Sequence, residues 1–361
     1  MIITDATHLP FWMLCDGSRL LPDYERPADT DTTLRDEGNA WHWLAQEGFE
    51  GRIDVREWRD GIKAPNGVLI TPQMFEHVRI YLGALWPGVM ETDTTWGEDN
   101  IFQIRGRADH IGYDEHSDIL YIDDGKYGFS IVEPMNNWTL ISHAIGWVRQ
   151  RGCITPSRIV ITIHQPRPYH PEGPTRSWTI TGDDLNALYQ RIRAKLSNPS
   201  DMLNTGSHCY KCPKLGNCPA ARAANMNAVD IMQTAFSDKL SDEQLAHEIK
   251  TCEYAFKLMK NRLDALKDMG KHRVQQGKVL PDFMLERTFS NTTWQKHVTP
   301  EMAQIMTGRD LSVRKLVTPV EARARGVPEL ILDAMTNRVE TGVKLVQVDV
   351  NRKMGKLTNA G

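Results

Sequence analysis

The sequence has few cysteines and no long apolar run, and each shortage excludes a class of protein. Six cysteines in 361 residues are too few for a small secreted fold held together by disulfides. No run of about 18 apolar residues is present to form a membrane span. The first residues, MIITDATHLPFWML, lack the basic segment of a signal peptide, and Pro10 interrupts their apolar run. We therefore expect a cytoplasmic protein whose cysteines stay reduced and can bind metal.

Charge and sequence patterns exclude further classes. The net charge is only −3, and the sequence contains no internal repeat or low-complexity tract. Residues 1–225 hold 22 Lys and Arg against 29 Asp and Glu, whereas residues 226–361 hold 21 against 17. The acidic first part suits carboxylates that bind metal ions, but the small basic excess in the second part does not by itself indicate nucleic-acid binding. No G-x-G-x-x-G motif follows a predicted strand, which argues against a nicotinamide or flavin enzyme.

The order of the predicted elements indicates a mixed α/β core. Apolar residues at helical spacing predict helices, and β-branched runs between polar turns predict strands. The expected elements are a helix over 33–48, two strands over 102–126 around the turn DEHSD, a helix over 137–151, a strand over 157–167, a second strand beginning at SWTI, and a helix over 183–196. Such an order is typical of a sheet flanked by helices.

The chain is long enough for two domains, or for two domains and an extension. The segment ARAANMNAV, residues 221–229, is small and polar and is expected to be a connector. Residues 241–275 are expected to form one or two long helices, with an apolar face at Leu245, Ile249, Leu258, Leu263 and Leu266. Boundaries near residues 225 and 278 then give a core of 1–225, a long helical segment of 226–278, and a small C-terminal α+β region of 279–361.

The two strands over 102–126 bring acidic residues together. If the turn centres on His116 and Ser117, Asp109 and Asp124 lie directly opposite each other, and such paired residues point to the same face. Lys126 shares that face because it is two residues beyond Asp124. A surface hairpin with a salt bridge explains these residues about as well. Two adjacent carboxylates repel each other unless a cation binds them, and hard ions such as Mg²⁺ prefer carboxylate oxygens.

Three cysteines lie close together in the segment CYKCPKLGNC, at the spacing C-x2-C-x5-C. A soft metal site usually has four ligands, so Cys209, Cys212 and Cys218 require one more. The alternatives are a four-cysteine zinc site and an iron–sulfur cluster, and the x5 spacing and the Cys-Pro pairs favour the cluster. Cys153 and Cys252 have no partner pattern and are expected to be buried free thiols.

These motifs follow one another in a recognisable order. Cys15 precedes GNAWH, which ends at His42, then GRAD ending at Asp109, DGK from Asp124 to Lys126, a helix near 139–151, and the three cysteines. In this order the chain resembles the PD-(D/E)XK nuclease superfamily, and specifically its RecB-like branch with an iron–sulfur cluster, which includes AddB-type helicase-nuclease subunits and CRISPR-associated nucleases. The resemblance covers roughly residues 11–220. The whole chain also resembles a phage-encoded family linked to recombination-type exonucleases.

The resemblance implies a restriction-endonuclease-like core, in which helices flank a mixed central sheet. It implies that Mg²⁺ or Mn²⁺ is bound by His42, Asp109 and Asp124, with the Gly125 carbonyl as a further ligand, and that Lys126 acts in catalysis with the two aspartates. It also implies that Cys15 is the fourth ligand of a [4Fe–4S] cluster. We assign this cluster a structural role, because it closes a loop of nearly two hundred residues.

The resemblance implies a metal-dependent DNA exonuclease that resects DNA ends in phage-type recombination or replication, in the host cytoplasm. The expected partner is DNA, as single- or double-stranded ends, without a membrane. A second copy of the chain and a single-strand annealing protein are further partners that the resemblance allows. The alternative is a catalytically silent DNA-binding scaffold that keeps the nuclease fold, and an iron–sulfur electron-transfer protein ranks last.

The chain departs from the family pattern on the helix that follows the lysine. RecB-like nucleases often have Q-x-x-x-Y there, whereas the matching positions are Thr139 and His143, which share a helix face. His143 is a candidate either for a phosphate contact or for packing. Gln165 and Arg167, in the QPR after a strand, are further candidates for substrate contacts, because arginine can hold a phosphate through two hydrogen bonds. Ordinary surface residues at a strand end are the alternative.

Overall fold

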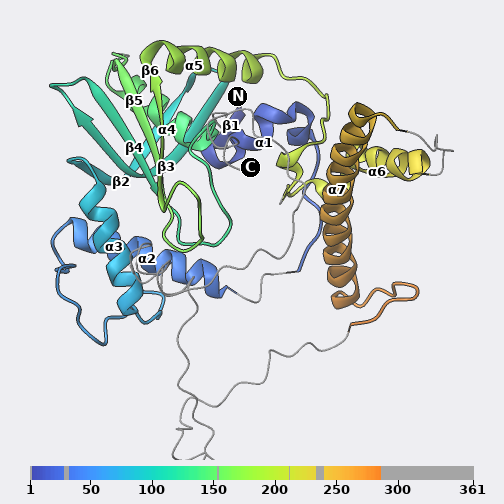
Figure 1. Cartoon of the computed structure of the whole chain (residues 1–361), viewed down its shortest axis with the longest axis horizontal. Helices are drawn as coiled ribbons and strands as arrows, with labels where there is room; N and C mark the ends of the chain where they lie inside the picture. The colour runs from blue at the N-terminus through green and yellow to red at the C-terminus, as the bar shows by residue number, and fades with distance from the viewer. Residues whose placement is uncertain (1, 28–31, 153, 211, 233–239, 286–361) are drawn as a thin grey trace, which may run out of the picture. The chain divides into compact units, whose positions relative to one another are not determined.

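The structure, a computed structural model, describes residues 2–27, 32–152, 154–210, 212–232 and 240–285. A mixed sheet with helices around it forms the core of this part of the chain (Figure 1). The α/β core expected from the sequence is therefore confirmed. The described residues all belong to one compact unit. The region expected over 279–361 falls outside the described residues from residue 286 onward.

The described elements follow one another from the N-terminus to residue 275. The strands are β1 (Ile2–Asp5), β2 (Gly88–Glu98), β3 (Phe102–Asp114), β4 (Ile119–Gly125), β5 (Arg158–His164) and β6 (Thr175–Thr181). The helices are α1 (Leu9–Leu14), α2 (Thr33–Phe49), α3 (Pro72–Ala84), α4 (Trp138–Gln150), α5 (Gly182–Ser197), α6 (Pro219–Met232) and α7 (Asp242–Gln275). Short 3₁₀ turns are η1 (Ala6–His8), η2 (Asp16–Leu20), η3 (Ser207–Cys209) and η4 (Leu215–Asn217).

The strand β3 has three neighbours, and this creates a gap in the sheet. β2 pairs antiparallel with one edge of β3 along most of its length. On the other edge, β1 pairs parallel with residues 102–105, and β4 pairs antiparallel with residues 110–114. Residues 106–109, which are the segment GRAD, therefore lie where this edge of β3 changes partner. Beyond β4 the sheet continues with β5 and then β6.

The hairpin of β3 and β4 has the register that the sequence predicts. His110 pairs with Asp123, and one further step along this register sets Asp109 beside Asp124. In the turn, the Asp114 carboxylate accepts a hydrogen bond from the backbone N–H of His116 at 3.0 Å. A polar turn with local side-chain hydrogen bonds fixes the pairing of the strands that it joins.

Helices cover the sheet and also form a second core. α4 packs against the sheet, where Ile141 and Ile145 join a buried cluster with Ile122 of β4 and Ile161 of β5. Its first turn is capped by Asn137, whose side chain accepts a hydrogen bond from the backbone N–H of Leu140. α2 and α3 pack against each other in a separate cluster of buried residues.

The segment after the cysteines differs from the expectation. Residues 221–229, expected to be a connector, lie within α6, so the boundary expected near residue 225 falls inside a helix. Alanine has the highest helix propensity of any residue, and Ala221 is buried in a cluster with Leu258 of α7. α7 is one continuous helix, on which Cys252 is exposed rather than buried. Cys153 lies outside the described residues.

The expectation of no membrane span agrees with the described helices. In this part of the chain, none of them combines the length and the apolar character that a bilayer crossing requires.

Candidate metal centre

The gap in β3 places Asp109 beside the end of β4. The backbone N–H of Gly125 donates a hydrogen bond to Asp109 Oδ2 at 2.8 Å. Next to this glycine, Asp124 forms an ion pair with Lys126, with 2.5 Å between Oδ2 and Nζ. The three residues predicted to act in catalysis, Asp109, Asp124 and Lys126, therefore lie together.

His42 reaches the same carboxylate from α2. Its Nδ1 lies 3.7 Å from Asp109 Oδ2. The helix can approach β4 this closely because residue 125 is a glycine: a Cβ at this position would lie 2.3 Å from Cζ3 of Trp41. Trp41 is fully buried and stacks on Tyr127, with 5.7 Å between ring centroids. The glycine of DGK thus sets the separation of the helix and the strand that carry the candidate ligands.

Glu91 is a candidate ligand that the sequence did not indicate. Ligand atoms of His42, Glu91 and Asp109 lie within 4.8 Å of one another, and no other three potential ligands among the described residues come this close together. Glu91 has a φ of 49°, a left-handed conformation that is rare within a strand. It interrupts the pairing of β2 with β3 opposite Asp109. Backbone strain of this kind is concentrated at functional sites.

This group of side chains suits a hard divalent cation. Two carboxylates supply oxygen ligands, which Mg²⁺ prefers, and an imidazole adds a nitrogen ligand that Mn²⁺ accepts. The three members of the group come from α2, β2 and β3. Asp124, on the adjacent strand β4, is not part of this group of three, and its carboxylate pairs with Lys126.

Burial and repulsion perturb the protonation of these groups. Burial, followed by the neighbouring Asp124 carboxylate, raises the pKa of Asp109 to about 6, and His42 and Lys126 oppose this shift. Burial acts to lower the pKa of Lys126, but the carboxylates of Asp124 and Asp109 outweigh it and raise that pKa. The lysine therefore stays charged at neutral pH, and Asp109 is the group that a bound cation would hold ionised.

We expect the metal-free protein to lose stability as the pH rises from about 4 to about 7. A carboxyl with a pKa of about 6 in the fold, against 3.8 ordinarily, binds its proton more tightly when folded. The Asp109 carboxyl therefore contributes its full stabilisation below the pKa that it has in the unfolded protein. This contribution is lost as the pH rises through the pKa that it has in the folded protein. The loss is about 3 kcal/mol at 1.36 kcal/mol per pKa unit.

Urea unfolding in EDTA across this range, with wild type and Asp109→Asn, measures the effect. The variant should match the wild type near the acid end and exceed its unfolding free energy at neutral pH, and added Mg²⁺ should stabilise only the wild type. A difference between the two proteins that does not change with pH contradicts the expectation.

The positions that match Q-x-x-x-Y are engaged within the protein. His143 is buried, and its Nδ1 lies 2.8 Å from Thr94 Oγ1. Burial lowers the pKa of His143 to about 4, so the ring is neutral at neutral pH and is not a cationic phosphate contact. The hydroxyl of Thr139 donates a hydrogen bond to the carbonyl of Ala6 at 3.4 Å. Both residues support the packing of α4, which was one of the alternatives for His143.

Gln165 supports the loop that follows Lys126. Its side chain is 1% exposed. Its Nε2 donates hydrogen bonds to the carbonyls of Gly128 and Ser130 at 3.2 and 2.8 Å, and its Oε1 accepts one from the N–H of Val132 at 3.1 Å. With both amide atoms used in this way, Gln165 shapes the loop and does not face a substrate.

Arg167 joins the same loop to α2. Its Nη1 lies 2.6 Å from Glu37 Oε2, and its guanidinium carbon lies 4.2 Å from the ring centroid of Phe129 and 4.7 Å from that of Tyr127. The ring of Phe129 is itself exposed. The charge of Arg167 is therefore paired within the protein, on the side of the loop next to the candidate ligands.

A buried hydrogen-bonded group lies next to the candidate metal ligands on β3 and β4. Asp123 precedes Asp124, and its two oxygens bond His110 Nδ1 and His164 Nε2, each at 3.0 Å. All three side chains are buried. Burial acts to raise the pKa of Asp123, but the two histidine hydrogen bonds outweigh it and lower that pKa. Because it ties β3, β4 and β5 together beside Asp109 and Asp124, this group positions the strands that carry the ligands.

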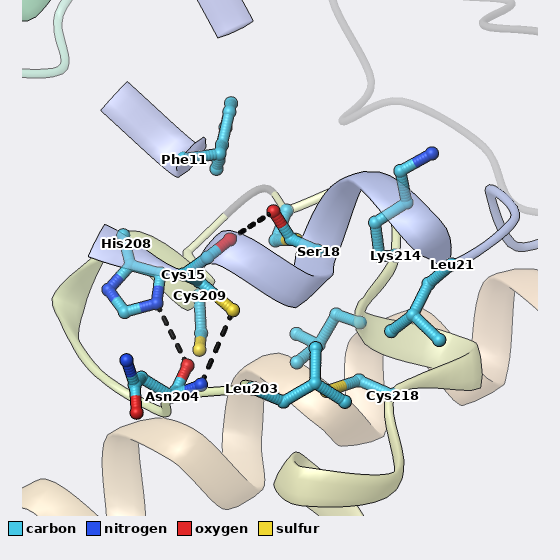
Figure 2. A pocket seen from close by; sticks show the side chains of 12 residues that line it. Phe11, Cys15, Ser18, Leu21, Leu203, Asn204, His208, Cys209, Lys214 and Cys218 are labelled. Carbon is cyan, nitrogen blue, oxygen red and sulfur yellow. Dashed lines mark hydrogen bonds between the residues drawn. The ribbon is translucent and has the colours of Figure 1, made fainter. Parts of the chain in front are cut away.

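The four predicted cluster ligands line one pocket away from the sheet. Cys15 follows α1, and the other three, Cys209, Cys212 and Cys218, lie on the loop before α6. Leu21, Leu203 and Leu215 also line the pocket. Figure 2 shows Cys15, Cys209 and Cys218 around it, with segments from the two ends of the core side by side.

The surroundings of the sulfur atoms suit metal-bound thiolates. Backbone N–H groups donate to three of them: Asn204 to Cys15 at 3.4 Å, Gly206 to Cys209 at 3.4 Å, and Ala221 to Cys218 at 3.5 Å. Hydrogen bonds to sulfur are a usual feature of iron–sulfur sites.

The four sulfur atoms do not form a close group. Within the described residues, no three of them lie within 4.8 Å of one another. Zinc and the cluster therefore both remain alternatives.

The chain was compared with known proteins. No family model matches the sequence, and no curated protein matches it. A solved structure described as "Crystal structure of SSO0001" is similar at 15% identity over 40% of this chain and 67% of that chain, with a TM-score of 0.23. At that TM-score, the likeness carries no argument about fold or function.

Proposed function

We propose that the protein is a divalent-metal-dependent deoxyribonuclease with a PD-(D/E)XK-type core. The observation that carries the proposal is the convergence of Asp109, Asp124, Lys126 and His42 at the gap in β3. Two adjacent carboxylates repel each other unless a cation binds them. Lys126 beside the two acids adds the cationic group that this class of reaction uses.

The ligands and the lysine have separate tasks in this proposal. A cation held by His42, Asp109 and Asp124, with Glu91 or the Gly125 carbonyl as a further ligand, supplies positive charge at the scissile phosphate and lowers the pKa of a water. Lys126 orients that water for attack on the phosphorus, in line with the departing sugar oxygen. The hydrogen bond from the Gly125 N–H keeps Asp109 in position.

The cysteines have a structural role in the same proposal. A [4Fe–4S] cluster held by Cys15, Cys209, Cys212 and Cys218 joins the segment after α1 to the loop before α6. A structural Zn²⁺ is the alternative occupant. The cluster supplies a rigid link, and the backbone N–H groups of Asn204, Gly206 and Ala221 stabilise the thiolates that hold it.

The substrate in this proposal is the end of a DNA strand, and the reaction is exonucleolytic resection in recombination or replication. A second candidate is a DNA-binding scaffold without activity. It is favoured by one observation: Thr139 and His143, at the positions of Q-x-x-x-Y, are engaged inside the protein and do not orient a substrate.

Incubating the anaerobically purified protein with DNA tests the proposal. The substrates are end-labelled linear single- and double-stranded DNA and a closed circular duplex, each with Mg²⁺, Mn²⁺ or EDTA. We expect shortening of the linear DNA with either metal, none in EDTA, and no cleavage of the circle. Cleavage of the circle would indicate an endonuclease. DNA binding without cleavage in any metal would overturn the nuclease proposal in favour of the scaffold.

A further inference from the structure

The long helix α7 has two apolar stripes. One of them packs against the rest of the same chain. The inner stripe packs on the cysteine loop and α6 through Leu258 and Ala265, which are both buried. Arg262 lies on this side too, and its Nη1 donates hydrogen bonds to the carbonyls of Leu215 at 2.9 Å and Cys218 at 3.4 Å. These contacts fix which side of α7 faces the rest of the core, and they leave another side open. Figure 1 shows α7 beside α6.

The second stripe, here called the outer stripe, consists of residues spaced alternately by four and three positions. Its members are Leu245, Ile249, Cys252, Phe256, Met259, Leu263 and Leu266. Such spacing over three heptads is the pattern of a coiled-coil seam. The four residues Leu245, Phe256, Leu263 and Leu266 are between 44% and 69% exposed, and Cys252 is exposed between them. Ile249 and Met259 are half-buried. A largely exposed apolar stripe of this length marks an interaction surface.

We propose that the outer stripe is a dimerisation seam that pairs antiparallel with α7 of a second copy of this chain. A stripe on one helix matches the identical stripe on a second copy when a two-fold axis relates the two helices. In an antiparallel pair the register that aligns Phe256 with Met259 of the second copy also aligns Cys252 with Leu263, and Ile249 with Leu266. Every residue of the outer stripe from 249 to 266 then meets an apolar partner.

Charges beside the outer stripe favour this orientation. In the antiparallel register Glu253 of one copy lies beside Lys260 of the other, and the two-fold axis repeats this ion pair. A parallel pair would instead bring Glu248 against Glu253, because flanking residues five positions apart meet across a parallel seam. These two residues have like charges. Flanking charges set the orientation of coiled coils, so the sequence selects the antiparallel arrangement.

The contacts of α7 with its own core agree with the same arrangement. Leu258 lies at the middle of α7 (Asp242–Gln275), and Arg262 and Ala265 follow it in the second half. All three lie on the inner stripe, so these contacts leave the outer stripe open to a second helix. This dimer is independent of the proposed catalytic activity, because no residue of the candidate metal centre takes part.

The molar mass in solution tests the seam. Light scattering after gel filtration of the full chain should give twice the 41.1 kDa of one chain. Phe256→Glu with Leu263→Glu should give a single-chain mass, because two charges then enter the seam. The matched control, His247→Glu with Tyr254→Glu, adds the same charges at exposed positions of α7 outside the outer stripe and should remain a dimer. A wild-type protein of single-chain mass, or a dimer that survives in the seam variant, would overturn the proposal.

Cys252 provides an independent test of orientation. In the antiparallel register it faces Leu263 of the second copy, so Leu263→Cys should yield a disulfide-linked dimer under mild oxidation. Adding Cys252→Ser to that variant should abolish the link, while circular dichroism shows that both proteins are folded. A dimer that is linked through Cys252 alone in the wild type would show a parallel pair and overturn the antiparallel register.

Discussion

Replacing Asp124 with asparagine should reduce metal-dependent DNA cleavage by about a thousandfold, the scale on which a positioned charged group contributes to catalysis. Asparagine keeps the shape of the side chain but removes one of the charges that hold the cation. It also removes the ion-pair partner of Lys126, so the lysine loses its fixed position. One change therefore affects both the binding of the cation and the placement of the cationic side chain.

Cleavage rates and thermal unfolding together separate this effect from misfolding. Mn²⁺ should raise the melting temperature of the wild type, and this rise should be absent in Asp124→Asn. Asp99→Asn is the matched control, because Asp99 is exposed near the end of β2, and it should cleave DNA and respond to Mn²⁺ like the wild type. Cleavage by Asp124→Asn at the wild-type rate would remove Asp124 from the proposed mechanism.

Replacing Cys15 with serine should remove the visible absorption of the proposed cluster and lower the unfolding free energy by about 5 kcal/mol, the scale that loop-closure entropy gives for a link across so long a loop. Cys15 is the one ligand that comes from the N-terminal segment. Without it, the remaining three thiolates are all on the loop before α6, and they no longer connect that loop to the segment after α1.

Iron and sulfide analysis, visible spectra and urea unfolding of anaerobically prepared protein measure this change. Cys252→Ser is the control for the colour, since Cys252 is exposed on α7 and distant in sequence from the other cysteines, and it should keep the visible absorption. Zinc in place of iron in the wild type would select the other occupant. Unchanged stability in Cys15→Ser would contradict the structural role.

Local sequence rules were sufficient for the central hairpin. The polar turn DEHSD fixed the register of β3 and β4, and from it the neighbourhood of Asp109 and Asp124 followed. Strong helical spacing likewise identified α2 and α4 within one residue of their ends. The long helix α7 was found for the same reason. These features depend on residues close together in the chain, where periodicity and turn chemistry are informative.

Features that depend on distant pairing were not predicted. β1 is four residues long and pairs with a strand about one hundred residues later, so its own sequence carries no strand signal. Glu91 was missed because β2 was not identified and because its backbone conformation is unusual for a strand. The group of His110, Asp123 and His164 comes from three strands, and only the sheet order brings it together.

Two expectations were wrong because they relied on residue type and not on the neighbours that the fold supplies. The small residues of 221–229 suggested a connector, but alanine favours a helix when a neighbouring helix buries it, as α7 buries Ala221. Cys252 was expected to be buried because cysteine usually is. It lies instead on the outer stripe of α7, whose apolar residues do not face their own core.

The distance along the chain between Cys15 and its partners also sets an order of events during synthesis. Cys15 leaves the ribosome about 200 residues before Cys218, an interval of about 10–40 s at ordinary rates of translation. β1 must likewise wait for β3 before it can pair. Throughout this time the first thiol and the apolar α1 have no native partners. For the proposed cluster, delivery of iron and sulfide must therefore follow the emergence of α6, and a chain made faster than the cluster is supplied would collect as an open, oxidation-sensitive intermediate.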